Sequence, residues 1–273
     1  MCCHQRKYTL QFFSPTDQNN QTIADLKNLL DSYYPWVFAP TLLKLYFSSR
    51  ILKSVAHFDR EYIEMPDGER ISLDRLPKNY DKMPKDTPTI ILVGGITTDS
   101  RSEYINIFMK YAVEDYGYRI GFMNRRGTCN MPFHRHDPDP ISWDKYDDLD
   151  NVVKHVNNRF HMANLYRAGT SMGANHIKKY VGLKGQNGES LPIKALGCLA
   201  SPFCLNFASK RFNEKGGIVK KALIKSLLNV FREQLSCERF VTAMKKRNID
   251  PQVILASKSS DDYTRELNLK FRD

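Results

Sequence analysis

The chain alternates apolar and polar residues in two different ways. Residues 57–65 and 69–76 alternate with a period of two on either side of Pro66-Asp67-Gly68, which is a turn signal. This arrangement predicts a β-hairpin. From residue 89 onward the short runs become mostly apolar, beginning with Thr89-Ile90-Ile91-Leu92-Val93. Runs of this kind are typical of strands that are buried on both faces of a parallel sheet.

Strand-like and helix-like segments then follow one another as far as residue 200. After the strand at 89–93 we expect a helix over 101–116, a strand over 119–124, a helix over 143–160, a strand over 164–168, a helix over 174–181, a glycine-rich turn over 182–188 and a strand over 193–200. Alternating elements of these lengths predict an α/β fold, with a mostly parallel central sheet and helices on both faces.

The first part of the chain has a different pattern. A short helix is predicted over 22–32, followed by an aromatic segment that Pro35 and Pro40 interrupt. We therefore predict an N-terminal arm over 1–56 and one α/β domain over 57–273, a size that fits a single large domain. The apolar stretch 33–47 is too short to span a membrane and carries Lys44. The start of the chain lacks the apolar run of a signal peptide, so we expect a cytoplasmic protein.

The candidate chemistry centres on Gly169-Thr170-Ser171-Met172-Gly173. This serine lies between two glycines, directly after a predicted strand and directly before a predicted helix. A tight turn of this kind exposes a serine as a nucleophile, and glycines are needed where a side chain would collide with the flanking strand or helix. Ser171 is therefore the candidate nucleophile of a hydrolase.

A second candidate lies at the end of the first parallel strand, at Gly94-Gly95-Ile96-Thr97-Thr98. In open α/β sheets ligands bind beyond the carboxyl ends of the strands, so this loop and Ser171 are expected at the same edge. Its backbone N–H groups would form one half of an oxyanion hole, and the N–H of Met172 the other half. A plain tight turn is the alternative for the two glycines, and the downstream serine favours the functional interpretation.

Charge and cysteine content indicate little further chemistry. The formal charge of +11 is concentrated towards the C-terminus, at Lys220-Lys221 with Lys225 and at Lys245-Lys246-Arg247. Solvated helix faces are favoured over a contact with anionic lipid, and no nucleic acid partner is expected. The six cysteines lack the spacing of a zinc site and are expected to be reduced. Cys2-Cys3 could carry S-acyl chains that tether the chain to a membrane surface, against the alternative of an unmodified terminus.

Five short segments, in this order, resemble the YheT-like branch of the α/β-hydrolases, which includes abhydrolase-domain lipases. The segments are Tyr34-Pro35-Trp36, Pro66-Asp67-Gly68, Gly95-Ile96-Thr97 with Ser102-Glu103-Tyr104, Asn124-Arg125-Arg126-Gly127 and Gly169-Thr170-Ser171-Met172-Gly173-Ala174-Asn175. The resemblance implies hydrolysis of acyl esters, with lipid-like esters as substrates and with neither a metal nor an organic cofactor. It implies that Ser171 is the nucleophile and that the N–H groups of Ile96 and Met172 form the oxyanion hole.

The catalytic base is the difficulty for this interpretation. In this fold the nucleophile is followed along the chain by an acid and then by a histidine. The last histidine here is His176, five residues after Ser171, and it is expected on the helix surface, pointing away from the strand ends. His134 and His136, in the loop after the strand at 119–124, are weaker candidates because such a loop is usually exposed.

The C-terminal segment leaves two functional hypotheses open. Residues 259–263 resemble the stretch that precedes the family's last two strands, which bring the acid and the base and which the sequence does not show. Asp261 and Asp262 are therefore expected in a helix N-terminal turn. Either the chain is a serine hydrolase by descent with a truncated end, or it is a non-catalytic binding module. In both cases the strand at 193–200 would form an open sheet edge that favours association.

Overall fold

The computed structural model describes residues 17–32, 57–139, 146–202 and 217–271, with five single residues between 203 and 216. The chain divides into two compact units, Met1–Tyr46 and Phe47–Asp273. In the first unit the predicted short helix is present as α1 (Asp17–Ser32), which begins five residues earlier than expected. The predicted boundary at residue 56, the aromatic arm, and Cys2 and Cys3 lie outside the described residues.

The predicted β-hairpin is confirmed. Strand β1 (Asp59–Glu64) pairs antiparallel with β2 (Arg70–Leu76). The backbone N–H of Met65 donates to the Glu69 carbonyl at 2.8 Å and closes the turn. Gly68 adopts a φ of +80°, which glycine reaches without the steric cost of a Cβ.

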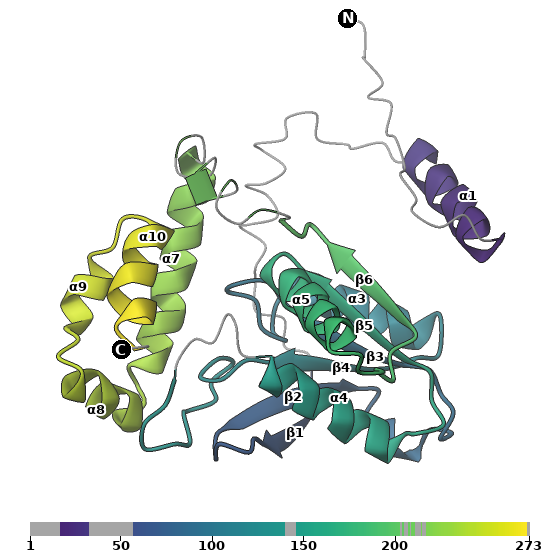
Figure 1. Ribbon diagram of the computed structural model, residues 1–273, viewed down its shortest axis with the longest axis horizontal. Helices are drawn as coiled ribbons and strands as arrows, with labels where there is room; N and C mark the ends of the chain where they lie inside the picture. Colours follow the sequence, from purple (N-terminus) through teal and green to yellow (C-terminus); the bar gives the residue numbers. More distant parts are fainter. Residues whose placement is uncertain are drawn as a thin grey trace, which may run out of the picture. The chain divides into compact units, whose positions relative to one another are not determined.

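The predicted mostly parallel sheet is also confirmed. It contains β3 (Thr89–Val93), β4 (Arg119–Asn124), β5 (Leu165–Thr170) and β6 (Ala195–Leu199), in the order β1-β2-β4-β3-β5-β6 (Figure 1). The hairpin joins through an antiparallel pairing of β2 with β4, and the other pairings are parallel. A short 3-10 helix, η1 (Tyr80–Lys82), lies between β2 and β3. Strand β6 ends the described sheet with largely exposed residues, and association through it stays a prediction.

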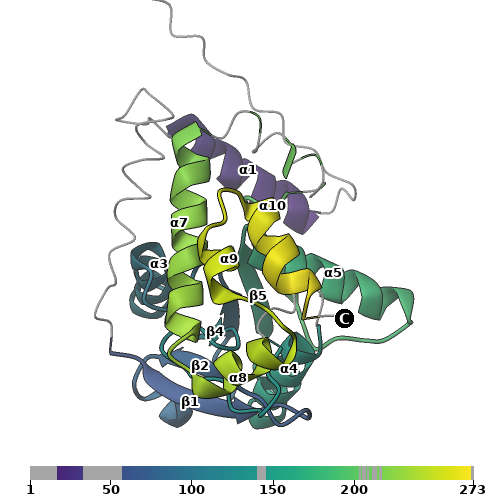
Figure 2. The same cartoon turned by 90° about the vertical axis from the view of Figure 1, so that its left-hand side faces the viewer.

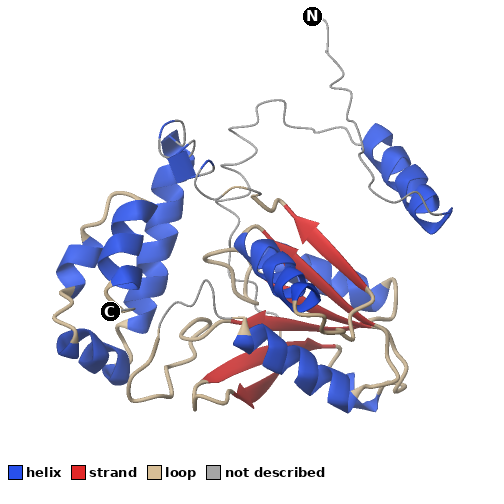
Figure 3. Ribbon diagram, in the orientation of Figure 1, coloured by secondary structure: helices blue, strands red, loops and turns tan. Residues whose placement is uncertain are grey.

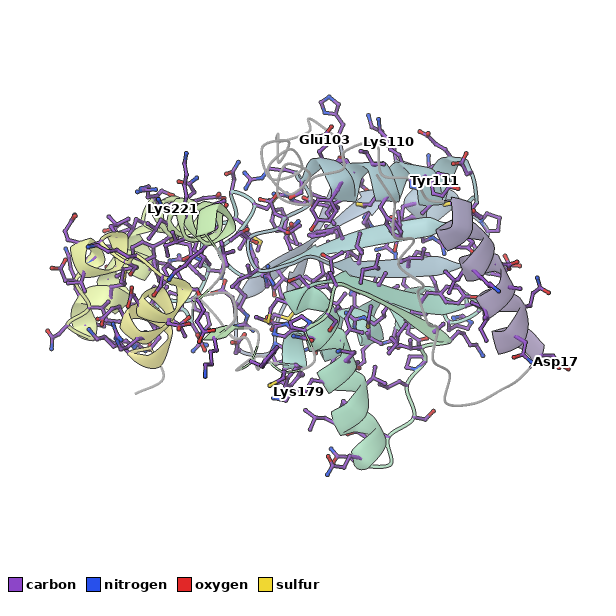
Figure 4. All side chains as sticks on the ribbon, turned by 90° about the horizontal axis from the view of Figure 1, so that it is seen from above. Asp17, Glu103, Lys110, Tyr111, Lys179 and Lys221 are labelled. Atoms are coloured by element: carbon purple, nitrogen blue, oxygen red, sulfur yellow. The ribbon has the colours of Figure 1, made fainter. Side chains whose placement is uncertain are left out.

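Helices cover both faces of the sheet (Figure 2). On one face α3 (Glu103–Glu114) packs on Ile90 and Leu92 of β3, and on the other face Ile91 and Val93 pack with α4 (Asp147–Arg159) and α5 (Met172–Gln186). Side chains on β3 thus alternate between two apolar layers, as a strand buried on both faces requires. Figure 4 shows Lys110 and Tyr111 of α3 on one side of the sheet and Lys179 of α5 on the other.

One predicted element is wrong. Residues 182–188 were expected to form a glycine-rich turn, but α5 continues through Gly182 and Gly185 to Gln186. The turn comes only at Gly188, whose φ is +71°. A helix tolerates interior glycine at a cost of roughly 1 kcal/mol, so these two glycines weaken α5 without ending it.

The C-terminal helices pack around their own apolar cluster, which includes Phe231 and Phe240. They are α7 (Gly217–Gln234), α8 (Glu238–Lys246), α9 (Pro251–Leu255) and α10 (Ser260–Tyr263), followed by a π-helical turn, η2 (Thr264–Leu269) (Figure 3). Asp261 and Asp262 lie in the first turn of α10, and the Ser259 hydroxyl accepts from the N–H of Asp262 at 3.1 Å. The expected helix N-terminal role of these two aspartates is confirmed.

The basic clusters of the C-terminal region lie on the polar sides of these helices. Lys221, Lys225, Lys245 and Lys246 are exposed, while the guanidinium of Arg247 donates to the Asp137 carboxylate at 2.9 Å. This exposure is what the solvated-face interpretation requires. Among the described residues, no helix combines the length and the apolar character that crossing a membrane would require.

Glu61 on β1 couples the hairpin to α4. Its carboxylate accepts at 2.9 Å from each of Arg75, His155 and Arg159. Burial by itself raises the pKa of Glu61, but the hydrogen bond from His155 and the charges of the two arginines together lower the pKa below its ordinary value. A depressed pKa in the folded state stabilises the fold above the unfolded pKa of about 4.3, and this contribution is lost as the pH falls through the folded pKa.

We therefore expect Glu61→Gln to lower the free energy of unfolding at pH 7 by about 1 kcal/mol, since the group is only half-buried and solvent screens the pairs. At pH 3 the difference from the wild type should shrink, because this pH lies below the unfolded pKa and the stabilisation is lost as the pH falls towards the lowered folded pKa. Urea unfolding at the two pH values measures this. Glu64→Gln, which removes an exposed partner of Arg70, is the control and should change little at either pH. A Glu61→Gln difference that is constant with pH would contradict the assignment.

Candidate active site

The turn between β5 and α5 holds Ser171 in a strained backbone conformation. Its φ is 51° and its ψ is −117°, a region that residues with a Cβ rarely adopt and that costs about 1–3 kcal/mol. Two hydrogen bonds hold it there: the N–H of Ser171 donates to the Leu199 carbonyl at 2.8 Å, and the N–H of Asn175 donates to the Ser171 carbonyl at 3.1 Å. The side chain of Ser171 is exposed. Strain at an exposed serine between strand and helix is the geometry of a nucleophile elbow.

The two glycines of the turn are required by close packing. A Cβ on Gly169 would lie 2.7 Å from Ile177 Cδ1 and 2.8 Å from the backbone nitrogen of Ala174. A Cβ on Gly173 would lie 2.4 Å from the carbonyl oxygens of both Val93 and Gly94. Helix α5 therefore starts in direct backbone contact with the end of β3. The structure places Ser171 at the predicted strand-to-helix turn, and its role as nucleophile stays a prediction.

The loop after β3 lies next to this turn. A Cβ on Gly95 would be 3.4 Å from Ser171 Cβ, which is van der Waals contact, so the Gly95 backbone lies about one carbon atom away from that contact with the serine. The N–H of Thr98 donates to the Gly95 carbonyl at 3.2 Å and closes the loop. Met172 is the first residue of α5, where backbone N–H groups have no partner within the helix. The structure thus brings the loop that contains Ile96 beside Ser171 and Met172, as predicted from strand topology.

Tyr104, in the first turn of α3, connects the two halves of this site. Its hydroxyl lies 2.9 Å from Thr98 Oγ1 and 3.2 Å from Thr170 Oγ1. It therefore joins the end of the glycine loop to the residue that precedes Ser171. Sequence reasoning noted Tyr104 only as part of a family segment, because nothing in the local pattern shows that α3 begins beside the end of β5.

Comparison with known proteins fits this geometry. No family model matches the chain. The chain is 27% identical over 253 residues to phospholipase ABHD3 of Mus musculus, an alignment that covers 85% of this chain and 59% of that protein. An open, mostly parallel sheet with a serine elbow at the strand edge is the arrangement of the α/β-hydrolases. The chain belongs to the α/β-hydrolase superfamily.

Further relatives of this α/β-hydrolase align over shorter stretches. It is 31% identical over 181 residues to embryogenesis-associated protein EMB8 of Picea glauca, covering 63% of this chain and 38% of that protein. Among solved structures, the ester hydrolase EH1AB1 from the metagenome of Lake Arreo aligns with 15% identity and a TM-score of 0.45, over 80% of this chain and 70% of that one. The chain spans about two fifths to three fifths of the length of EMB8 and ABHD3. Its place in the YheT-like branch stays a prediction.

The two loop histidines of this α/β-hydrolase are held away from the elbow. The backbone N–H of His134 donates to the Glu69 carboxylate at 2.6 Å, and Arg239 donates to the His134 carbonyl. Glu69 precedes β2, which is three strands away from β5, a separation of roughly 14 Å at the usual strand spacing. The side chains of His134 and His136 are exposed. Over the described ranges, no hydrogen bond joins the Ser171 hydroxyl to an imidazole.

The expectation for His176 is wrong in one respect. It was predicted on the helix surface, but only 6% of the residue is exposed, and its ring meets that of Tyr146 edge-on at 5.9 Å between centroids. His176 shares the buried face of α5 with Gly173, Ile177 and Tyr180, at the i, i+3, i+4 and i+7 positions of one helix face. That spacing was present in the sequence and could have identified it as a packing residue.

A buried polar network fixes the segment between the glycine loop and α3. Asp74 on β2 accepts from Asn124 Nδ2 at 2.8 Å, from Arg60 Nε at 2.7 Å and from the Ser100 hydroxyl. The N–H of Ser100 in turn donates to Asn124 Oδ1 at 2.9 Å. These residues lie far apart in sequence and were not predicted to meet. Their hydrogen bonds satisfy one another, so the chain leaves the glycine loop along one fixed path.

The described ranges contain no group of three or more histidine, cysteine or acidic side chains arranged to hold a metal ion. The expectation that the chemistry needs neither a metal nor an organic cofactor stays a prediction. Arg125, which follows β4, is a charged group beside the glycine loop, and burial lowers its pKa to about 10.

Proposed function

We propose that this chain is a serine hydrolase that acts on acyl esters of the lipid type, with Ser171 as nucleophile. The observation that carries the proposal is the strained, exposed Ser171 close to the Gly95 loop. The substrate class is supported by the relatives, which are named phospholipase ABHD3 and monoacylglycerol lipase ABHD2. Because the chain spans only part of these proteins, their activity reaches it only as a proposal.

The proposed reaction follows from where charge develops. Ser171 Oγ attacks the ester carbonyl carbon, and the carbonyl oxygen becomes an oxyanion. The N–H groups of Ile96 and Met172 donate to that oxyanion, and the start of α5 adds the positive end of a helix dipole. The intermediate then expels the alcohol and leaves an acyl group on Ser171, which water removes as the free acid. The proton of the serine hydroxyl passes to a base, which returns it to the oxygen of the departing alcohol.

A fluorophosphonate probe tests the proposal, because it phosphonylates a serine only when that serine is activated. We expect the full chain to be labelled at Ser171, located by peptide mass spectrometry, and Ser171→Ala to remove the label. In serine proteases that lack the base, binding and the oxyanion hole still give a rate of about 10³ over water. Slow labelling that requires Ser171 would therefore also support the proposal.

Ser201→Ala is the matched control, since Ser201 lies near the elbow and its hydroxyl donates to Asn175 Oδ1 at 2.5 Å. Its labelling should equal that of the wild type. If the wild-type chain is not labelled, the proposal fails, and the chain is better explained as a binding module that keeps the fold without turnover.

A further inference from the structure

The guanidinium of Arg125 contacts the backbone of the glycine loop. Arg125 follows β4 directly, and its Nη2 donates to the carbonyl of Gly95, while Nη1 lies 3.5 Å from the carbonyl oxygen of Gly94. The neighbouring Arg126 binds the carboxylates of Asp67 and Asp148 instead. The two consecutive arginines therefore have different partners, and only Arg125 reaches the loop beside Ser171.

This hydrogen bond determines where the next N–H points. A trans peptide unit is planar, and its C=O and N–H point in opposite directions. The Gly95 carbonyl and the Ile96 N–H belong to the same unit, so fixing one fixes the other. Strand β3 lies between β4 and β5, and Arg125 follows β4 whereas Ser171 follows β5. With the Gly95 carbonyl directed to the β4 side, the Ile96 N–H is directed to the β5 side, where Ser171 lies.

We propose that Arg125 is a positioning residue of the oxyanion hole, which holds the Gly95–Ile96 peptide so that the Ile96 N–H faces the carbonyl that Ser171 attacks. This inference rests on the proposed function. Without the contact from Arg125, the Gly95–Ile96 peptide unit could rotate and present its carbonyl oxygen where the oxyanion develops. That oxygen would repel the negative charge of the oxyanion. The N–H of Thr98 also donates to the Gly95 carbonyl, so part of the orientation should survive without Arg125.

The test compares the second-order rate constants of fluorophosphonate labelling for the full chain and its variants. Arg125→Met keeps an unbranched apolar stem and removes the hydrogen-bond donors. Loss of one oxyanion donor costs about 10²–10³-fold in other hydrolases, and partial loss of its orientation should cost about 10- to 100-fold here. Arg125→Lys, with a single flexible ammonium group, should be labelled at a rate between those of Arg125→Met and the wild type. Millimolar guanidinium chloride should restore part of the rate to Arg125→Ala, which a purely structural loss would not allow.

Arg101→Met is the matched control. Arg101 is also partly buried, but it donates to carboxylates, to Asp99 at 2.8 Å and to Glu233 at 3.2 Å, rather than to the glycine loop. Its labelling rate should stay within twofold of the wild type. If Arg125→Met or Arg125→Lys is labelled as fast as the wild type, this inference fails and the proposed function stands. If the wild type itself is not labelled at Ser171, both fail.

Discussion

Replacing Gly173 by alanine is expected to destabilise the fold by ~3 kcal/mol or more, although it adds only one methyl group. That methyl carbon would lie 2.4 Å from two backbone oxygens, those of Val93 and Gly94. Backbone atoms cannot rotate away as a flexible side chain can. Relief would require α5 to move off the sheet or β3 to leave its pairing with β4 and β5. Either movement also displaces Ser171, so labelling by the fluorophosphonate should fall with stability.

Gly182→Ala on the same helix is the matched control, and its effect should have the opposite sign. Apart from its chain neighbours and the backbone of its own helix, no atom lies within 4 Å of a Cβ on Gly182. Because Gly182 is an exposed residue inside a helix, alanine should stabilise the protein by about 0.5–1 kcal/mol. Urea unfolding of the three proteins measures both effects. If Gly173→Ala unfolds at the wild-type urea concentration, α5 does not start against β3 as described.

The strands were more predictable from sequence than the helix ends, for a physical reason. The bounds of β3 and β4 match the prediction because each is a short apolar run followed by polar or glycine residues, and burial on two faces leaves that signal in the sequence itself. The end of α5 was misplaced because Gly182, Gly185 and Gly188 all resemble helix stops. Only Gly188 takes a positive φ, and that choice depends on the following chain rather than on the glycine.

The candidate site also contains residues that the sequence identifies and residues that only the fold identifies. Ser171 and the Gly95 loop were found because their function requires a local sequence, a glycine-flanked turn at a strand end. Arg125 and Tyr104 were not assigned roles, because each acts through a neighbour that the strand order β4-β3-β5 brings close. A single sequence gives the direction of the strands but not this lateral order. Partners separated by 30 to 66 residues therefore become visible only in the fold.

Arg126→Met should be the second large effect, with a loss of about 3–5 kcal/mol in the free energy of unfolding. The side chain of Arg126 is 6% exposed and forms two hydrogen bonds with Asp148, at 2.8 and 2.5 Å. It also donates to Asp67 in the hairpin turn at 2.5 Å. Burial by itself lowers the pKa of Arg126, but these hydrogen bonds and the two carboxylate charges raise it, so the guanidinium stays charged. Methionine would leave the buried Asp148 carboxylate without its partner.

The loss of stability in Arg126→Met should come from the unpaired Asp148 carboxylate rather than from the lost attraction between the two charges. A double variant separates these two contributions. Adding Asp148→Leu to Arg126→Met removes the unpaired charge, so the double variant should recover most of the stability that the single variant loses. Arg70→Met provides the surface comparison, because Arg70 and its partner Glu64 are 41% and 72% exposed and their pair should contribute less than about 1 kcal/mol. If the double variant is as unstable as Arg126→Met alone, then Arg126 stabilises the fold mainly through Asp67, by holding the hairpin turn, and the buried pair with α4 contributes little.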